Sequence, residues 1–152
     1  LWLWGGFAGR HDGKEPSLEL GGLVYDPAKD KWSEIQGPAT PEGEKVATGG
    51  GAAATLSDGR IAVAGGVNKD IFLDALKNQA PDYLLHPIAW YRFNPRIFIF
   101  DPASGKWTAG NPDAMNTRAG ASMIAGDNND LYLFGGELKP RIRTPRTLHV
   151  VL

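Results

Sequence analysis

The chain has 152 residues, enough for one domain with a buried core, and its formal net charge is −1. This near-neutral balance gives no indication of binding to nucleic acids or anionic membranes, and no apolar run approaches the roughly 20 residues of a membrane span. No cysteine is present, which excludes disulfides and a thiol nucleophile, while 20 glycines, 11 prolines and many aromatic residues predict numerous strands and turns.

The chain opens on a segment of strand character that recurs twice. LWLWGGF (1–7), IAVAGGV (61–67) and LYLFGGE (131–137) each combine four strand-forming residues with two glycines. The glycine pairs begin at positions 5, 65 and 135, so the spacing is 60 and then 70 residues. We expect these glycines to adopt positive φ or to permit a close backbone approach at the end of each strand.

A second motif lies between the copies of the first. YDPAKDKW (25–32) and FDPASGKW (100–107) agree at five of eight positions. The Asp-Pro pair predicts a tight turn, because proline fixes φ and aspartate accepts a hydrogen bond from the backbone beyond it. The tryptophan and the preceding aromatic residue are expected to pack one sheet on the next. A looser third pair, 49–60 and 119–130, places a small-residue strand and a turn before the Gly-Gly strand.

Four strands per unit with a Gly-Gly signature resemble the kelch repeat, which has a period of about 50 residues and builds the blades of a β-propeller. The predicted fold is therefore all-β: a partial kelch-type β-propeller of about two and a half four-stranded blades. An incomplete blade spans 1–48, a full blade 49–108, and another incomplete blade 109–152. We interpret 1–152 as a segment of one propeller domain. A partial propeller that assembles with itself is the alternative, and its open faces predict self-association.

One connection is too long to be a simple turn. Residues 68–95 contain leucines and aromatic residues at patchy helical spacing, interrupted by Pro81 and Pro87. A long connection in a compact domain usually covers a binding site or is disordered, and this one is too apolar for disorder. It predicts a short helical insertion over one face of the propeller.

Several segments together resemble the bacterial N-acetylneuraminate epimerase family, the sialic acid mutarotases. They are GGVNKDIF (65–72), the insertion, AWYRFNPRIFIFDP (89–102) and GGELKPRIRT (135–144). The likeness follows the whole chain in order and covers the middle of the family's length. It implies a six-bladed periplasmic propeller that interconverts the α and β anomers of N-acetylneuraminate, a sugar acid, without a cofactor.

The resemblance also implies two catalytic residues, Glu137 for proton transfer and Arg143 as its partner. The chemistry fits these residue types, because anomerisation removes a proton from the anomeric hydroxyl and protonates the ring oxygen, and one carboxylate can do both. A guanidinium can hold the substrate carboxylate through two hydrogen bonds. The family pattern has glycine where this chain has Arg141, and a bulkier residue there can re-aim Arg143.

Three further residues are candidates for substrate binding. Asn68 follows the second Gly-Gly and is placed either to bond sugar hydroxyls or to complete a loop turn. Arg118 opens an inner strand and either points into the central channel or anchors a neighbouring blade. Lys139 either adds to the positive potential that attracts an anionic sugar or is a solvated loop charge.

Other interpretations of these residues remain open at this point. Glu137 and Arg143 can equally form a surface ion pair, and the protein can be a non-catalytic kelch module that binds a glycan or a protein. His86 and His149 have no second ligand at a suitable spacing, so no metal site is predicted. Asp127 and Asp130 indicate a hairpin turn rather than a calcium loop.

Overall fold

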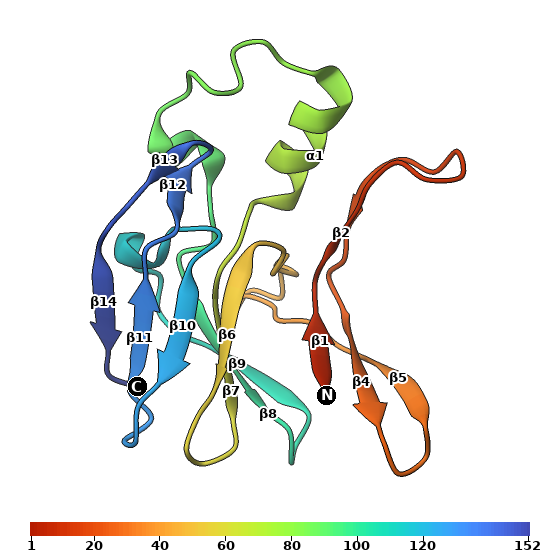
Figure 1. The fold of residues 1–152 in the computed structure, drawn as a ribbon, viewed down its shortest axis with the longest axis vertical. Helices are drawn as coiled ribbons and strands as arrows, with labels where there is room; N and C mark the ends of the chain where they lie inside the picture. Colours follow the sequence, from red (N-terminus) through yellow and green to blue (C-terminus); the bar gives the residue numbers. More distant parts are fainter.

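A computed structural model describes all 152 residues and shows a chain of short antiparallel strands (Figure 1). The helical elements are α1 (Lys69–Asn78) and the two 3-10 helices η1 (Ile88–Tyr91) and η2 (Ala114–Asn116). The strands are β1 (Trp2–Trp4), β2 (Phe7–Ala8), β3 (Ser17–Leu18), β4 (Gly22–Asp26), β5 (Lys31–Ile35), β6 (Gly51–Thr55), β7 (Ile61–Gly65), β8 (Ile97–Asp101), β9 (Lys106–Ala109), β10 (Ser122–Ala125), β11 (Leu131–Phe134), β12 (Glu137–Lys139), β13 (Ile142–Arg143) and β14 (Thr147–Val150). None of the helices is long and apolar enough to cross a membrane.

Three sheets follow one another along the chain. The central sheet has four strands in the order β6-β7-β8-β9, all antiparallel, and lies within 49–108. The first sheet, β1-β4-β5, holds the counterparts of the last three strands of the central sheet, and the third sheet, β10-β11-β14, holds the counterparts of its first three. The predicted all-β partial propeller with a helical insertion is confirmed.

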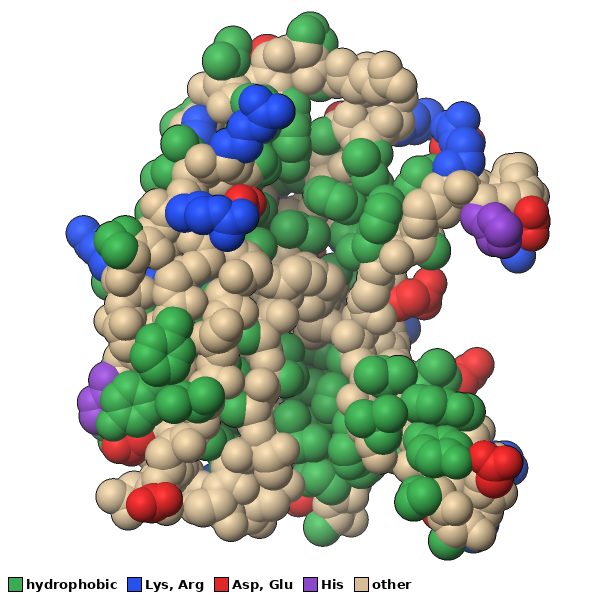
Figure 2. All heavy atoms as spheres, in the orientation of Figure 1, with side chains coloured by type: hydrophobic (Ala, Val, Ile, Leu, Met, Phe, Trp, Pro, Cys, Tyr) green, Lys and Arg blue, Asp and Glu red, His purple; other side chains and the backbone are tan.

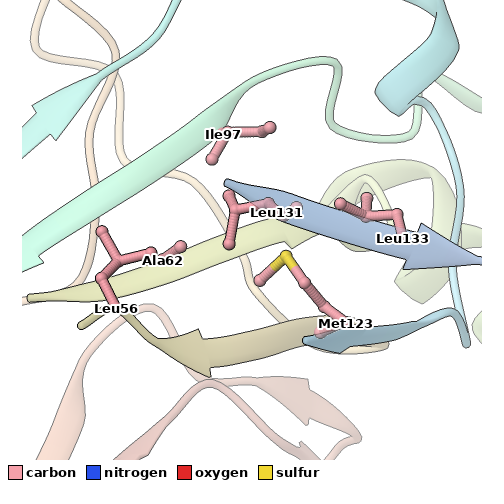
Figure 3. Packing of buried hydrophobic residues seen from close by; sticks show 8 residues of the cluster. Leu56, Ala62, Ile97, Met123, Leu131 and Leu133 are labelled. Atoms are coloured by element: carbon pink, nitrogen blue, oxygen red, sulfur yellow. The ribbon is translucent and has the colours of Figure 1, made fainter. Parts of the chain in front are cut away.

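The boundary between the central and third sheets is aliphatic. Small and branched side chains of the central sheet, including Ala62, Ala64 and Ile97, pack against Met123, Leu131 and Leu133 of the third. Figure 3 shows the labelled members of this cluster directed toward one another from strands of both sheets. Because strand side chains alternate between faces, one apolar face of each sheet is buried here.

The boundary between the first and central sheets is aromatic. The rings of Trp2 and Trp4 lie parallel, 5.7 Å apart, and both contact Phe100 of the central sheet. The indole of Trp107 meets that of Trp4 at 5.1 Å, and both indole N–H groups donate to the backbone oxygen of Gln36. The predicted packing role is thus filled by Phe100 and Trp107, whereas Tyr25 and Trp32 contact each other and Trp32 is 43% exposed.

The three Gly-Gly pairs all adopt positive φ, as predicted. The values are 68° and 115° for Gly5 and Gly6, 71° and 108° for Gly65 and Gly66, and 61° and 92° for Gly135 and Gly136. Each pair ends a strand and starts a connection: the β2–β3 hairpin, the α1 insertion and the β12–β13 hairpin. These three connections lie at the same end of the molecule (Figure 1), and this end carries every candidate site residue.

The Asp-Pro turns also form as predicted, at the opposite ends of their sheets. The Oδ1 atom of Asp101 accepts a hydrogen bond from the backbone N–H of Ala103 at 2.9 Å. Asp26 accepts one from Ala28 at 3.0 Å. Each turn therefore closes on its own aspartate, two residues on.

Candidate functional site

The central feature of the candidate site is the β12–β13 hairpin, which follows the last Gly-Gly pair. Its first residue, Glu137, is fixed by two backbone hydrogen bonds to Ala119, the N–H of each residue donating to the other's oxygen at 2.7 and 3.0 Å. Thr144 closes the hairpin by donating its N–H to the oxygen of Gly136 at 2.9 Å. The backbone of the hairpin is therefore fixed to the segment that precedes the inner strand β10.

Glu137 and Arg143 lie opposite each other in this hairpin. They are direct partners in the β12–β13 register, and Nη2 of Arg143 lies 3.2 Å from Oε1 of Glu137. The Glu137 side chain is 27% exposed and that of Arg143 is 74% exposed, so a ligand can reach both groups. The structure thus brings the predicted acid and its predicted partner together on one accessible face.

The tight turn of the hairpin contains Arg141, which adopts a left-handed backbone with φ of 68°. Glycine adopts this conformation readily, whereas an L-residue with a side chain is strained in it. The backbone keeps the geometry that the family's glycine would allow, and Arg143 still reaches Glu137. The substitution therefore adds strain to the turn without separating the pair.

Lys139 contacts the insertion rather than open solvent. Its Nζ donates to the backbone oxygens of Leu84 at 3.0 Å and His86 at 2.7 Å, and lies 5.8 Å from the centre of the Tyr91 ring. Two of its three N–H donors are used in this way. This differs from both roles considered for Lys139, because the cation joins the hairpin to the insertion and is only partly exposed.

Arg118 is buried beneath the hairpin, with 2% of its surface exposed. Its guanidinium donates to three backbone oxygens, those of Gly135, Met115 and Arg146. The guanidinium therefore anchors segments of its own blade, 109–152, which differs from the predicted anchoring of a neighbouring blade.

Asn68 begins the insertion. Its Oδ1 accepts a hydrogen bond from the N–H of Ile71 at 3.1 Å, which caps the N-terminus of α1. The hollow that Asn68 lines contains neither Glu137 nor Arg143. Of the two predicted roles of Asn68, the structure favours completion of the loop turn over binding of sugar hydroxyls. The amide N–H groups of Asn68 take no part in the helix cap.

An aromatic cluster in the insertion supports Lys139 and was not singled out from the sequence. Tyr91 is 1% exposed, and its hydroxyl donates to the backbone oxygen of Tyr83. Burial raises the pKa of the Tyr91 hydroxyl. The ring of His86 stacks on that of Trp90 with centres 3.8 Å apart. The aromatic residues of 89–93 are visible in the sequence, but the sequence does not indicate that they contact Lys139 of the hairpin.

The two histidines considered as metal ligands, His86 and His149, each contact a single aspartate. His149 lies 2.9 Å from Asp130, and His86 lies 3.6 Å from Asp82. No group of three or more potential ligands is close enough to hold a metal ion. Figure 2 shows instead that Lys and Arg side chains gather where Figure 1 places the β12–β13 hairpin and the adjoining loop.

The fold and the site together define a segment of a β-propeller whose loop end carries an accessible carboxylate–guanidinium pair within a cationic surface. A sequence model of the N-acetylneuraminate epimerase family matches residues 1–152. The chain belongs to the N-acetylneuraminate epimerase family.

Individual relatives agree with this assignment. The chain is 32% identical over 149 residues to the N-acetylneuraminate epimerase of Brucella melitensis, covering 88% of this chain and 37% of the relative. It is 30% identical to that of Salmonella typhimurium, covering 95% of this chain and 39% of the relative. A solved structure of YjhT aligns with a TM-score of 0.77 at 24% identity, covering 97% of this chain and 44% of YjhT. The chain therefore spans well under half the length of these relatives, and the YjhT likeness concerns the fold.

Proposed function

We propose that this chain provides the proton-transferring glutamate and its partner arginine in a mutarotase that interconverts the α and β anomers of N-acetylneuraminate. The observation that carries the proposal is the 3.2 Å contact between Arg143 and Glu137 on an accessible hairpin face. The family assignment over residues 1–152 supports the choice of substrate. An accessible carboxylate can serve as base and then as acid in this reaction.

Glu137 is proposed to move the proton. As the carboxylate, it accepts the proton of the anomeric hydroxyl while the bond between the anomeric carbon and the ring oxygen breaks. The protonated Glu137 then gives this proton to the ring oxygen, which leaves an open-chain keto acid. The carbonyl rotates to present its other face, and the same transfers in reverse close the ring to the other anomer. General acid–base catalysis of this kind contributes about 10²–10⁴-fold.

Arg143 is proposed to hold the substrate. N-acetylneuraminate carries a carboxylate on its anomeric carbon, and a guanidinium binds a carboxylate through two parallel hydrogen bonds. Arg143 is largely exposed and contacts Glu137 through one Nη atom, so further N–H groups remain for the substrate. Binding the substrate there places the reacting carbon beside Glu137, which makes the proton transfer effectively intramolecular.

Exchange of the anomers measured by NMR tests the proposal. Glu137→Gln keeps the size of the side chain but removes its ability to accept a proton. We expect the catalysed rate to fall to the spontaneous rate, with N-acetylneuraminate binding largely retained. Glu15→Gln is the matched control, because Glu15 also pairs with an arginine, Arg10, at 3.1 Å on another connection at this end of the molecule.

The second candidate is a non-catalytic module that uses the same face to bind a glycan or a protein. The exposed pair is as suitable for binding as for catalysis, and the structure contains no second acid in contact with Arg143. Binding of N-acetylneuraminate without faster anomer exchange in the wild-type protein would favour this candidate. Exchange that Glu137→Gln leaves unchanged would exclude Glu137 as the catalytic acid.

Two further expectations belong to the same proposal. A periplasmic location is expected from the family resemblance.

Self-association of the 152-residue chain is supported by apolar side chains exposed on the outer faces of the first and third sheets, namely Leu3, Leu23, Trp32, Ile124 and Phe134. Sedimentation at increasing protein concentration would show it, and a single monomeric species throughout would argue against it.

A further inference from the structure

A charged hollow lies beside the β12–β13 hairpin. It has a volume of about 620 Å³ and is lined by Leu138 and Thr144 of the hairpin segment. Side chains alternate along a strand, and Leu138 follows Glu137 while Thr144 follows Arg143. Neither member of the catalytic pair lines this hollow.

Three arginines line the hollow, and we refer to it as the arginine hollow. They are Arg92 at the end of η1, Arg118 before β10, and Arg146 before β14. No Asp or Glu lines it, and none of the three arginines forms an ion pair. The neighbouring hollow that also contains Arg92 differs, because two acids, Glu44 and Asp70, line it together with its cations.

Arg118 supplies hydrogen-bond donors that the protein itself does not use. A guanidinium has five N–H donors, and three of those of Arg118 are bound to backbone oxygens. Its Nε is buried and has no hydrogen-bond partner. The residue as a whole is only 2% exposed. A buried donor without an acceptor is unfavourable. Arg118 lines the hollow, so its positive charge and its unused donors favour an anion there.

The charges of the hollow also repel one another. Burial lowers the pKa of the Arg118 guanidinium, and the neighbouring charge of Arg146 lowers it further. Arg92 adds a third positive charge from a strained position, since its φ is 48°. Strained backbone in a folded protein often marks a functional position. An anion placed among the three guanidinium groups relieves the repulsion.

The remaining walls of the hollow are largely apolar. They include Ile88 and Phe93 from the insertion, Met115 from η2, and Leu138 from the hairpin. Small-molecule sites are typically hollows of about 300–1,000 Å³ with apolar walls and a few polar groups that fix the orientation of the ligand. The arginine hollow has these properties.

We propose that the arginine hollow binds a small organic carboxylate with an apolar body, at a site separate from Glu137 and Arg143. Arg118 and Arg146 bind the carboxylate oxygens, and Arg92 covers them from the insertion. The apolar body lies against Phe93, Met115 and Leu138. Because this ligand also contacts the insertion and the hairpin, its binding stabilises the contact between these two connections.

Titration of the protein with sodium benzoate, followed by amide NMR, tests this proposal. Benzoate combines one carboxylate with a flat apolar ring. We expect saturable shifts at the amides of Leu138 and Thr144, beyond those produced by sodium chloride at equal ionic strength. Arg146→Ala and Arg92→Ala should each weaken binding at least about tenfold, because each removes one charge-assisted contact.

Arg143→Ala is the matched control. Arg143 belongs to the same hairpin segment and is also exposed, but it does not line the hollow. Its replacement by alanine changes the net charge by the same amount as the other two substitutions. Benzoate affinity within twofold of wild type is expected for this variant. Shifts that chloride reproduces, or an equal loss of affinity in Arg143→Ala, would overturn the proposal.

The test does not depend on mutarotase activity. Arg92 and Arg146 are exposed, so their substitutions are expected to leave the fold intact, and the dispersion of the amide spectrum checks this. Glu137→Gln should bind benzoate as the wild type does. A failure of the mutarotase proposal would therefore leave the benzoate result unchanged. Likewise, a failure to bind benzoate would leave the mutarotase proposal unchanged.

Discussion

Gly65 and Arg118 are in direct contact across the boundary between the central and third sheets. A Cβ atom on Gly65 would lie 2.4 Å from the backbone oxygen of Arg118, and the next residue, Gly66, donates its N–H to that same oxygen at 2.9 Å. The contact recurs one repeat earlier, where a Cβ on Gly5 would lie 2.4 Å from Oγ1 of Thr48. The Gly-Gly pair is therefore the point at which neighbouring sheets meet, in addition to being a turn.

Gly65→Ala should destabilise the protein strongly. The new Cβ would meet a backbone atom rather than a flexible side chain, and alanine would also have to adopt φ of 71°. Left-handed backbone costs about 1–2 kcal/mol, and overpacking typically adds about 1–3 kcal/mol. We expect a loss of about 3 kcal/mol in the free energy of unfolding, measured by urea denaturation with tryptophan fluorescence.

Gly105→Ala is the control for this substitution. Gly105 has nearly the same φ, 68°, but no atom lies within 4 Å of the position of its Cβ. Only the backbone cost of about 1–2 kcal/mol applies there. Equal losses at the two positions would show that the close approach to Arg118 contributes nothing.

The sequence was sufficient to predict features that depend on local chemistry. The positive φ of the Gly-Gly pairs and the turn that closes on Asp101 follow from glycine, proline and aspartate themselves. Repetition then showed how many copies of the unit are present, and so predicted the sheets. The placement of Glu137 opposite Arg143 is likewise local, because a tight hairpin joins residues six positions apart.

Features that depend on distant contacts were not predicted. Lys139 bonds to residues 53 and 55 positions away, and nothing in its own segment indicates that partner. Arg118 donates to carbonyls of segments that come together only in the folded chain. Asn68 is different, because an asparagine directly before a helical segment is a recognised N-cap signal, and the helix start was available from the sequence.

Lys139→Met should loosen the insertion without unfolding the sheets. The substitution keeps an unbranched side chain of nearly the same length but leaves the oxygens of Leu84 and His86 without their charged donor. Hydrogen bonds to charged groups contribute about 1.5–3 kcal/mol, so hydrogen exchange at residues 83–91 should accelerate at least about tenfold. Lys77→Met, at an exposed position near the end of α1, should leave this exchange rate unchanged. Unchanged protection in Lys139→Met would mean that the insertion is held by its aromatic cluster alone.

Arg141→Gly should stabilise the β12–β13 hairpin. Arg141 has φ of 68°, and glycine adopts this conformation without the steric cost of a Cβ. We expect the free energy of unfolding to rise by about 1 kcal/mol, with Glu137 and Arg143 still paired. Lys14→Gly is the control, because it also replaces an exposed cation by glycine but at a residue whose backbone is not left-handed. The free energy of unfolding should stay the same or fall in this variant. A loss of stability in Arg141→Gly would indicate that the arginine side chain makes a favourable contact that outweighs its backbone strain.

The Asp-Pro turns predict that stability falls in acid. The pKa of Asp101 is lowered from its ordinary value of 3.8 by hydrogen bonds, first from the Ser104 hydroxyl and then from the Ala103 N–H. A carboxyl whose pKa is lower in the folded than in the unfolded state contributes stability above the unfolded pKa, and this contribution disappears as the pH falls through the folded pKa. The midpoint of urea denaturation should therefore be steady down to about pH 4 and decrease below it.

Asp101→Asn should reduce this decrease, because asparagine does not titrate, while its single amide oxygen can still accept the N–H of Ala103. The decrease should not vanish, since hydrogen bonds also lower the pKa values of Asp26 and Asp58. Asp127→Asn, in the β10–β11 turn, is the matched control and should show the wild-type dependence on pH. Denaturation midpoints that fall equally with pH in the wild type and in Asp101→Asn would show that the Asp101 turn contributes nothing to acid sensitivity, because the turn would then be equally stable with its carboxyl neutral or charged.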